Sequence, residues 1–127
     1  MPQIWRTPPV APDEAAVAAA VAALEAGGVV AYPTDTLYAL GADAWRRDAV
    51  ERVFALKGRD PGVAMPLIAS DLSQVERSLG RLSPVAHRLA AAFWPGPLTL
   101  VVPAPASLPG GGTGAGAVAT SGAGGAP

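Results

Sequence analysis

Helical patterns that start at capping residues alternate along this chain with short apolar runs. One such run, Val29 to Tyr32, is bounded by Gly27-Gly28 and by Pro33, as a buried strand would be. A helical pattern from Asp13 to Ala26 precedes it, with Asp13 as N-cap and Gly27 just past its end. Helices that alternate with short strands indicate an α/β fold, because each strand can then be covered by a neighbouring helix.

Three more helical patterns begin at capping residues. Asp48, with Glu51 three positions later, predicts a capping box, and Asp71 and Ser83 are the expected N-caps of the other two helices. The spacing of apolar side chains places them on one face of each of three helices, and in the second helix it predicts a wide buried face. These faces comprise Val17, Val21 and Leu24 in the first helix, Ala49, Val50, Val53, Phe54 and Leu56 in the second, and Val85, Leu89 and Phe93 in the last.

Polar side chains crowd the loop that follows the Val29 to Tyr32 run. Thr34, Asp35, Thr36 and Tyr38 come where the predicted strand ends. In an open α/β sheet, ligands bind beyond the carboxyl ends of the strands, so these side chains would lie at the rim of such a crevice. The alternative is that Thr and Asp are turn formers here, with side chains that bond to nearby backbone groups.

Two cations fall where the second helix ends, in Lys57-Gly58-Arg59. Cations in a last helical turn complement the helix dipole, so simple stabilisation of the helix end is one interpretation. The other is an anion clamp, because Arg offers a planar fork of donors and Lys a mobile point charge suited to polyphosphate or carboxylate.

The last helical pattern is stopped by Pro95-Gly96-Pro97. The chain then enters an expected strand from Leu98 to Val102, which leaves Thr99 near its start. Another short strand is expected from Leu67 to Ala69.

Together these segments resemble the YrdC-like family of threonylcarbamoyl-AMP synthases. The resemblance covers about residues 14 to 103 and, since four ordered motifs carry it, is far more specific than any one of them. The motifs are Tyr32-Pro33-Thr34-Asp35-Thr36-Leu37-Tyr38-Ala39-Leu40-Gly41, Lys57-Gly58-Arg59, Pro66-Leu67-Ile68 and Trp94-Pro95-Gly96-Pro97-Leu98-Thr99. The fold that it implies is a twisted open sheet of mixed parallel and antiparallel strands with flanking helices.

The resemblance implies a nucleotidyltransferase that joins L-threonine, bicarbonate and ATP, with Mg²⁺, into threonylcarbamoyl-AMP and pyrophosphate. Other proteins then pass the threonylcarbamoyl group to an adenosine of tRNA, so tRNA or the tRNA-modifying transferase complex is an expected partner. The family pattern assigns the threonine site to Thr34, Thr36 and Tyr38, the ATP phosphates and catalysis to Lys57 and Arg59, and nucleotide contacts to Thr99.

The chain departs from the family pattern after Val102. The expected Val-Arg-x-Pro motif is absent, and Ala119-Thr120-Ser121 is followed by Gly122-Ala123 where the family has a Ser-x-Asn motif. Only Ser121 carries over, as a nucleotide-binding residue. We therefore expect the C-terminal part of the domain to be incomplete and the chain to be an impaired catalyst.

The expected domain organisation has three parts. Residues 1–12 form an extended lead-in and residues 13–103 a partial YrdC-like domain. Residues 104–127 hold no charged residue and are rich in Gly, Ala and Pro, so we expect a disordered remnant of the domain's C-terminal part.

Composition and charge argue against several other classes of function. Nine basic against ten acidic residues argue against a large basic footprint for nucleic acid. The chain has no cysteine, so no thiolate chemistry and no Cys-based metal site are expected, and no other metal site is predicted. No apolar run has the length of a membrane span and no basic segment precedes an apolar one, so no membrane contact and a cytoplasmic location are expected.

Two other functions stay open. YrdC-like domains also occur in hydrogenase maturation proteins that make carbamoyl-AMP, so a carbamoyl-transfer module is one. The other is a non-catalytic remnant that binds nucleotide or RNA, which the missing C-terminal motifs favour.

Overall fold

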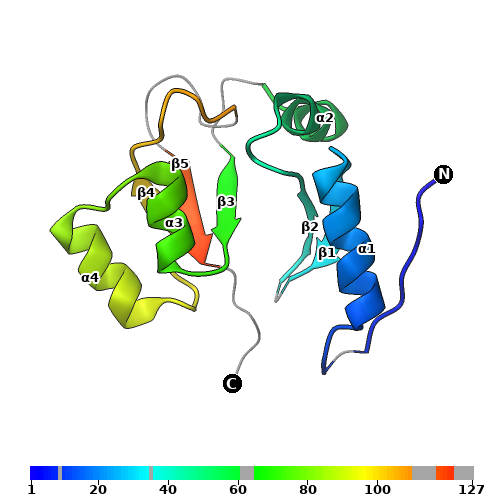
Figure 1. The fold of residues 1–127 in the computed structure, drawn as a ribbon, viewed down its shortest axis with the longest axis horizontal. Coiled ribbons are helices and arrows are strands. Elements are labelled where there is room, and N and C mark those ends of the chain that lie inside the picture. Colours follow the sequence, from blue (N-terminus) through cyan, green and yellow to red (C-terminus); the bar gives the residue numbers. More distant parts are fainter. Residues whose placement is uncertain (9, 35, 61–64, 110–116, 122–127) are drawn as a thin grey trace. The chain divides into compact units, whose positions relative to one another are not determined.

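The computed structural model describes residues 1–8, 10–34, 36–60, 65–109 and 117–121 (Figure 1). The chain divides into two compact units, Met1–Gly58 and Arg59–Pro127. Each contains helices and a small sheet, so the fold is mixed α/β, as predicted.

The first unit is built from two helices and a hairpin. Helix α1 spans Glu14–Glu25, strands β1 and β2 span Val30–Pro33 and Tyr38–Gly41, and helix α2 spans Arg47–Lys57. The two strands pair antiparallel over their whole length, from Val30 opposite Gly41 to Pro33 opposite Tyr38. Thr34, Thr36 and Leu37, which lie between the two strands, therefore belong to a hairpin turn.

Helix α1 starts and ends as its sequence predicts, and its buried residue is an alanine. The Asp13 carboxylate accepts a hydrogen bond from Ala15 N–H at the N-terminus, and Gly27 follows the C-terminus with φ of 83°. Among the apolar residues, Ala16 is buried, whereas the side chains of Val17 and Val21 are each 46% exposed. The small alanine face packs inward because it lets the helix axis approach its neighbours closely.

Helix α2 has the predicted core but not the predicted cap. The N-cap is Arg46, which makes no side-chain capping bond, and Asp48 lies inside the first turn, where its carboxylate pairs with Arg46 instead. Leu56 is 67% exposed, against prediction, because it lies on the outer side of the last turn. The buried residues of the helix are Ala49, Val50, Val53 and Phe54, as predicted.

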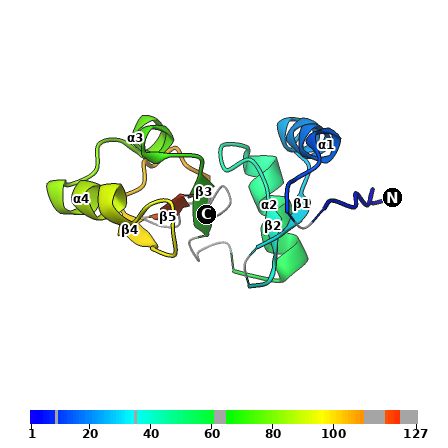
Figure 2. The same ribbon diagram turned by 90° about the horizontal axis from the view of Figure 1, so that it is seen from below.

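The second unit carries a mixed sheet of three strands. Strands β3 (Pro66–Ala69), β4 (Leu100–Val102) and β5 (Ala117–Ser121) are ordered β3-β5-β4, with β5 parallel to β3 and antiparallel to β4. Helices α3 (Leu72–Leu79) and α4 (Pro84–Phe93) connect β3 to β4. Both helices lie on one face of this sheet (Figure 2).

The core of the second unit lies between these helices and the sheet. It is formed by Val75 of α3, Leu82 of the connection, Ala90 of α4 and Val102 of β4. The predicted N-caps are confirmed, since Asp71 accepts from Gln74 N–H and Ser83 from Ala86 N–H.

The buried residue of α4 does not lie on its predicted apolar face. Val85, Leu89 and Phe93 do share one face of the helix, but their side chains are 58%, 37% and 57% exposed. Ala90 is buried in their place and Ala86 packs beside it. As in α1, the face with small side chains is the one that approaches the sheet.

The C-terminal segment contains the central strand of the sheet. Disorder is the wrong expectation for residues 117–121, because β5 pairs with β3 on one side and with β4 on the other. Residues 110–116 and 122–127 of the same expected tail lie outside the described residues. The expectation rested on the average composition of 24 residues, which does not reveal the short Ala-Val-Ala-Thr-Ser run. The backbone groups of this run pair with two neighbouring strands.

We predict that the Asp71 cap stabilises the second unit measurably. Its Oδ1 accepts from Gln74 N–H at 2.7 Å, so Asp71→Ala should lower the free energy of unfolding by about 1 kcal/mol. Asp71→Asn keeps an accepting oxygen and should lose much less. Urea denaturation of the three proteins measures the difference, and equal midpoints for wild type and Asp71→Ala would contradict the prediction.

Candidate functional site

The turn between β1 and β2 is closed by the hydroxyl of Thr34. This oxygen accepts from Thr36 N–H at 3.3 Å and from Leu37 N–H at 3.1 Å, and donates to Leu37 O. The Thr34 N–H also donates to Leu37 O, at 3.2 Å. The Thr34 side chain therefore acts as a turn former. Asp35, the carboxylate of this turn, lies outside the described residues.

Thr36 and Tyr38 offer the accessible hydroxyls of the turn. The Thr36 Oγ1 lies 3.4 Å from the Thr34 Oγ1, so the structure brings these two predicted residues together. Tyr38 opens β2 opposite Pro33, and its side chain is 80% exposed. Strand β2 pairs antiparallel with β1, so in this unit the loop that carries these side chains is a hairpin turn.

The strand that leads to this turn carries the other tyrosine of the chain. The Tyr32 ring lies against the backbone of Gly41, where an added Cβ would be 2.8 Å from Tyr32 Cε1. Partial burial raises the pKa of Tyr32 above its ordinary value, because burial penalises the charged phenolate. This hydroxyl is therefore protonated at neutral pH and is no general base there.

Lys57 and Arg59 flank the residue that ends α2. Lys57 is the last residue of the helix, and Gly58 adopts the left-handed conformation with φ of 63°, which turns the chain out of the helix before Arg59. Both cations are exposed, and within the described ranges neither side chain has a hydrogen-bond or ion-pair partner. Lys57 belongs to the first unit and Arg59 to the second. Their free charges suit the binding of an anion.

Thr99 and Ser121 come to the same end of the three-stranded sheet. Leu100 pairs with Ala119 in antiparallel register, so Thr99 lies one step before β4 and Ser121 two steps after Ala119. Ser121 also pairs with Ala69, the last residue of β3. The carboxyl ends of the two parallel strands thus meet beside Thr99, at the edge where ligands bind in sheets of this kind.

The conformation of the loop before Thr99 accounts for the Trp-Pro-Gly-Pro sequence of that loop. The Trp94 indole N–H donates to Leu98 O at 2.7 Å, and Leu98 N–H donates to Gly96 O at 2.8 Å. A Cβ on Gly96 would lie 2.5 Å from Phe93 O, so only glycine fits there. The motif is therefore explained by the backbone path into β4.

Two arginines that are not predicted site residues tie α2 to the end of α1. Arg46 donates to Glu25 O at 2.8 Å, and Arg52 donates to Gly27 O at 2.6 Å. Hydrogen bonding and charge from Arg46 lower the pKa of Asp48 below its ordinary value. No local pattern reveals these contacts, because the partners lie 21 and 25 residues away in the sequence.

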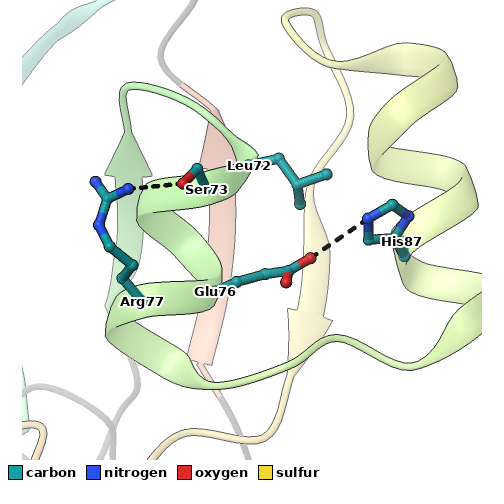
Figure 3. A pocket seen from close by; sticks show the side chains of 5 residues that line it. All are labelled: Leu72, Ser73, Glu76, Arg77 and His87. Carbon is teal, nitrogen blue, oxygen red and sulfur yellow. Dashed lines mark hydrogen bonds and ion pairs between the residues drawn. The ribbon is translucent and has the colours of Figure 1, made fainter.

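A groove of about 480 Å³ lies between α3 and α4 (Figure 3). His87 Nε2 lies 3.4 Å from Glu76 Oε1, and Arg77 donates to Ser73 Oγ at 2.6 Å. The polar side chains of the groove are thus paired with one another, and Leu72 is its fifth lining residue. None of the predicted site residues lines this groove.

Two searches of the described part of the chain were negative. No three His, Cys, Asp or Glu side chains there are grouped as metal ligands would be. No helix in the same ranges has both the length and the apolar character needed to cross a bilayer.

Comparison with known proteins identifies the family. Residues 22–120 match the family model Sua5/YciO/YrdC, whose description is "Telomere recombination". The threonylcarbamoyl-AMP synthase of Thiobacillus denitrificans is 44% identical over 86 residues, which are 68% of this chain and 46% of that protein. That of Bacillus subtilis is 41% identical over 87 residues, 68% of this chain and 25% of that protein.

Solved structures agree with this assignment. A crystal structure of P. abyssi Sua5 complexed with L-threonine has a TM-score of 0.80 and 33% identity, over 87% of this chain and 33% of that one. E. coli YciO has a TM-score of 0.80 and 26% identity, over 95% of this chain and 60% of that one. This chain belongs to the Sua5/YciO/YrdC family, and it spans about half the length of several of the curated relatives that it matches.

We predict that the two threonine hydroxyls of the turn have separable roles. Thr34→Val removes the acceptor of the Thr36 and Leu37 amides and should destabilise the turn by about 0.5–1.5 kcal/mol, with faster hydrogen exchange at the Leu37 amide. Thr36→Val removes a hydroxyl on which no described backbone group depends, and should leave that exchange rate unchanged. NMR exchange measurements on both variants test this, and equal effects would contradict it.

Proposed function

We propose that this chain provides the L-threonine and ATP site of a threonylcarbamoyl-AMP synthase, for the threonylcarbamoyladenosine modification of tRNA. The observation that carries the proposal is its 44% identity to relatives named threonylcarbamoyl-AMP synthase. The solved relative with bound L-threonine, at a TM-score of 0.80, supports threonine as the substrate.

The proposed reaction balances as two steps. L-threonine and bicarbonate first condense to a carbamate with loss of water. A carbamate oxygen then bonds to the α-phosphorus of ATP, while the bond from that phosphorus to the bridging oxygen breaks and pyrophosphate leaves. Negative charge builds on the phosphoryl oxygens, so positioned cations are the principal catalytic requirement.

The site residues divide this work between them. We assign Thr36 and Tyr38 to direct contacts with L-threonine, and Thr34 to holding their turn in shape. Lys57 and Arg59, whose charges have no partner in the described ranges, would bind the ATP phosphates, and Thr99 and Ser121 the rest of the nucleotide. Mg²⁺ would enter with ATP, since it is held largely by substrate phosphates and water in such sites.

The same proposal sets the expected partners and location. The product is a mixed anhydride that water can hydrolyse, so a transferase that passes it to tRNA should act close by. We propose that the reaction takes place in the cytoplasm, where bicarbonate, ATP and tRNA are available together.

The decisive experiment is an assay of pyrophosphate release from ATP, bicarbonate and Mg²⁺ with the whole chain. Release that requires L-threonine, and stops when serine or alanine replaces it, is expected. Release that requires carbamoyl phosphate would instead indicate a carbamoyl-transfer module. Nucleotide binding without release under either condition would contradict a catalytic role.

We predict that Arg59 contributes a charge-assisted contact to the ATP phosphates. Arg59→Ala should weaken ATP binding by about 1.5–3 kcal/mol, roughly 10- to 150-fold in Kd. Arg88→Ala is the matched control, because Arg88 is also exposed, belongs to the same unit and is not a predicted site residue. Titration calorimetry that finds the same ATP affinity in wild type and Arg59→Ala would contradict this.

Lys57 allows a direct check of the same site, because it is the only lysine of the chain. Reductive methylation with a ¹³C label marks its amine and the N-terminus alone. ATP should shift the Lys57 methyl resonance at concentrations that match the calorimetric Kd. A resonance that does not move while ATP binds would place the phosphates elsewhere.

A further inference from the structure

The corner between α1 and β1 is a tightly closed helix end. Gly28 N–H donates to Ala23 O at 2.8 Å and Gly27 N–H to Leu24 O at 3.0 Å, which is the Schellman pattern. Gly27 is buried and has a positive φ, which favours glycine. Two carbonyls of this corner, those of Glu25 and Gly27, accept from arginine side chains that come from the α2 segment.

Arg46 makes the first hydrogen-bonded link to this corner. Its Nη1 donates to Glu25 O at 2.8 Å, while its Nε and Nη2 donate to the two carboxylate oxygens of Asp48 at 3.3 and 3.2 Å. The guanidinium plane is thus fixed by Asp48 on one side and lies over Gly27, where an added Cβ would be 2.8 Å from its central carbon. Such two-point binding by a planar fork sets direction as well as distance.

Arg52 makes the second link, from the middle of α2. Its Nη1 donates to Gly27 O at 2.6 Å. Lys57 lies five positions after Arg52 in the same helix, which corresponds to about 7.5 Å along its axis. The carbonyl that Arg52 holds belongs to the corner from which β1 runs to the Thr34 turn.

We propose that Arg46 and Arg52 are positioning residues that set the place of Lys57 relative to the threonine-binding turn. They do so by fixing the helix that ends at Lys57 to the corner that starts β1. This inference rests on the proposed function for the roles of the turn and of Lys57, whereas the link itself is a feature of the first unit alone.

Apolar packing cannot set this geometry by itself. The face of α2 formed by Ala49, Val50, Val53 and Phe54 is at most 5% exposed and holds the helix in the fold. That attraction is non-directional, so it resists separation far more than small slides or rotations of the helix. The arginine hydrogen bonds are directional and oppose such movements. Their loss should therefore change the geometry more than the stability.

The test measures the geometry directly, because the chain has no cysteine of its own. Nitroxide labels on Leu37→Cys and Leu56→Cys, which replace an exposed side chain of the turn and one beside Lys57, report the distance between the two by pulsed dipolar spectroscopy. In this background Arg52→Met removes the donor but keeps an apolar stem. Arg52→Lys restores a donor, and Arg47→Met is the matched control, since Arg47 is exposed in the same helix.

We expect a distance distribution that is broader or displaced in Arg52→Met, partly restored in Arg52→Lys and unchanged in Arg47→Met. An unchanged distribution in Arg52→Met would overturn the inference. Should that variant fail to fold by circular dichroism, Asp48→Asn carries the same test through Arg46, whose orientation Asp48 fixes. There too a broader or displaced distribution is expected, and an unchanged one would overturn the inference.

Kinetic measurements on the same variants separate this inference from the proposed function. Arg52→Met should lower threonine-dependent pyrophosphate release at saturating substrate by roughly 10- to 100-fold, with a much smaller change in KM and with partial rescue by Arg52→Lys. If the distance distribution changes in Arg52→Met but the wild-type chain binds neither ATP nor L-threonine, the link stands and the proposed function is refuted. Equal turnover in wild type and Arg52→Met would refute the positioning role.

Discussion

The structure depends on how backbone groups are satisfied where a helix or strand ends. The candidate site residues lie at or beside such ends, because a chain that changes direction leaves donors and acceptors that its own ladder cannot pair. Thr34 supplies the missing partner in the β1–β2 turn, Arg52 at the end of α1, and Trp94 in the loop before β4. Side chains that close these ends also decide where the neighbouring polar groups point.

Short-range signals in the sequence predicted the elements well. The capping roles of Asp13, Asp71 and Ser83 involve backbone groups two or three residues away, so the local pattern contains all the information required. The same is true of the mixed α/β class and of the bonds between the Thr34 hydroxyl and nearby backbone groups. Asp48 was the exception, because Arg46 competes for its carboxylate with the backbone amides.

Features that depend on contacts between residues far apart in the sequence were not predicted, because local patterns carry no information about those contacts. The buried faces of α1 and α4 depend on how closely each helix approaches its neighbours, and periodicity alone favours large apolar side chains over alanine. The strand β5 owes its place to partners 15 to 52 residues away, such as Val102 and Pro66, so its composition gave no sign of it. The arginine links across 21 and 25 residues are of the same kind.

The division of labour in the turn follows from these constraints. A hydroxyl that bonds two backbone amides has little capacity left for a ligand, so Thr34 is suited to shape and Thr36 to contact. The same separation applies to the cations. Arg46 and Arg52 are committed to carbonyls within the first unit, whereas the charge of Lys57 at the end of the same helix has no described partner. A phosphate would therefore meet Lys57 without first displacing an internal bond, while the committed arginines keep the helix that carries it in place.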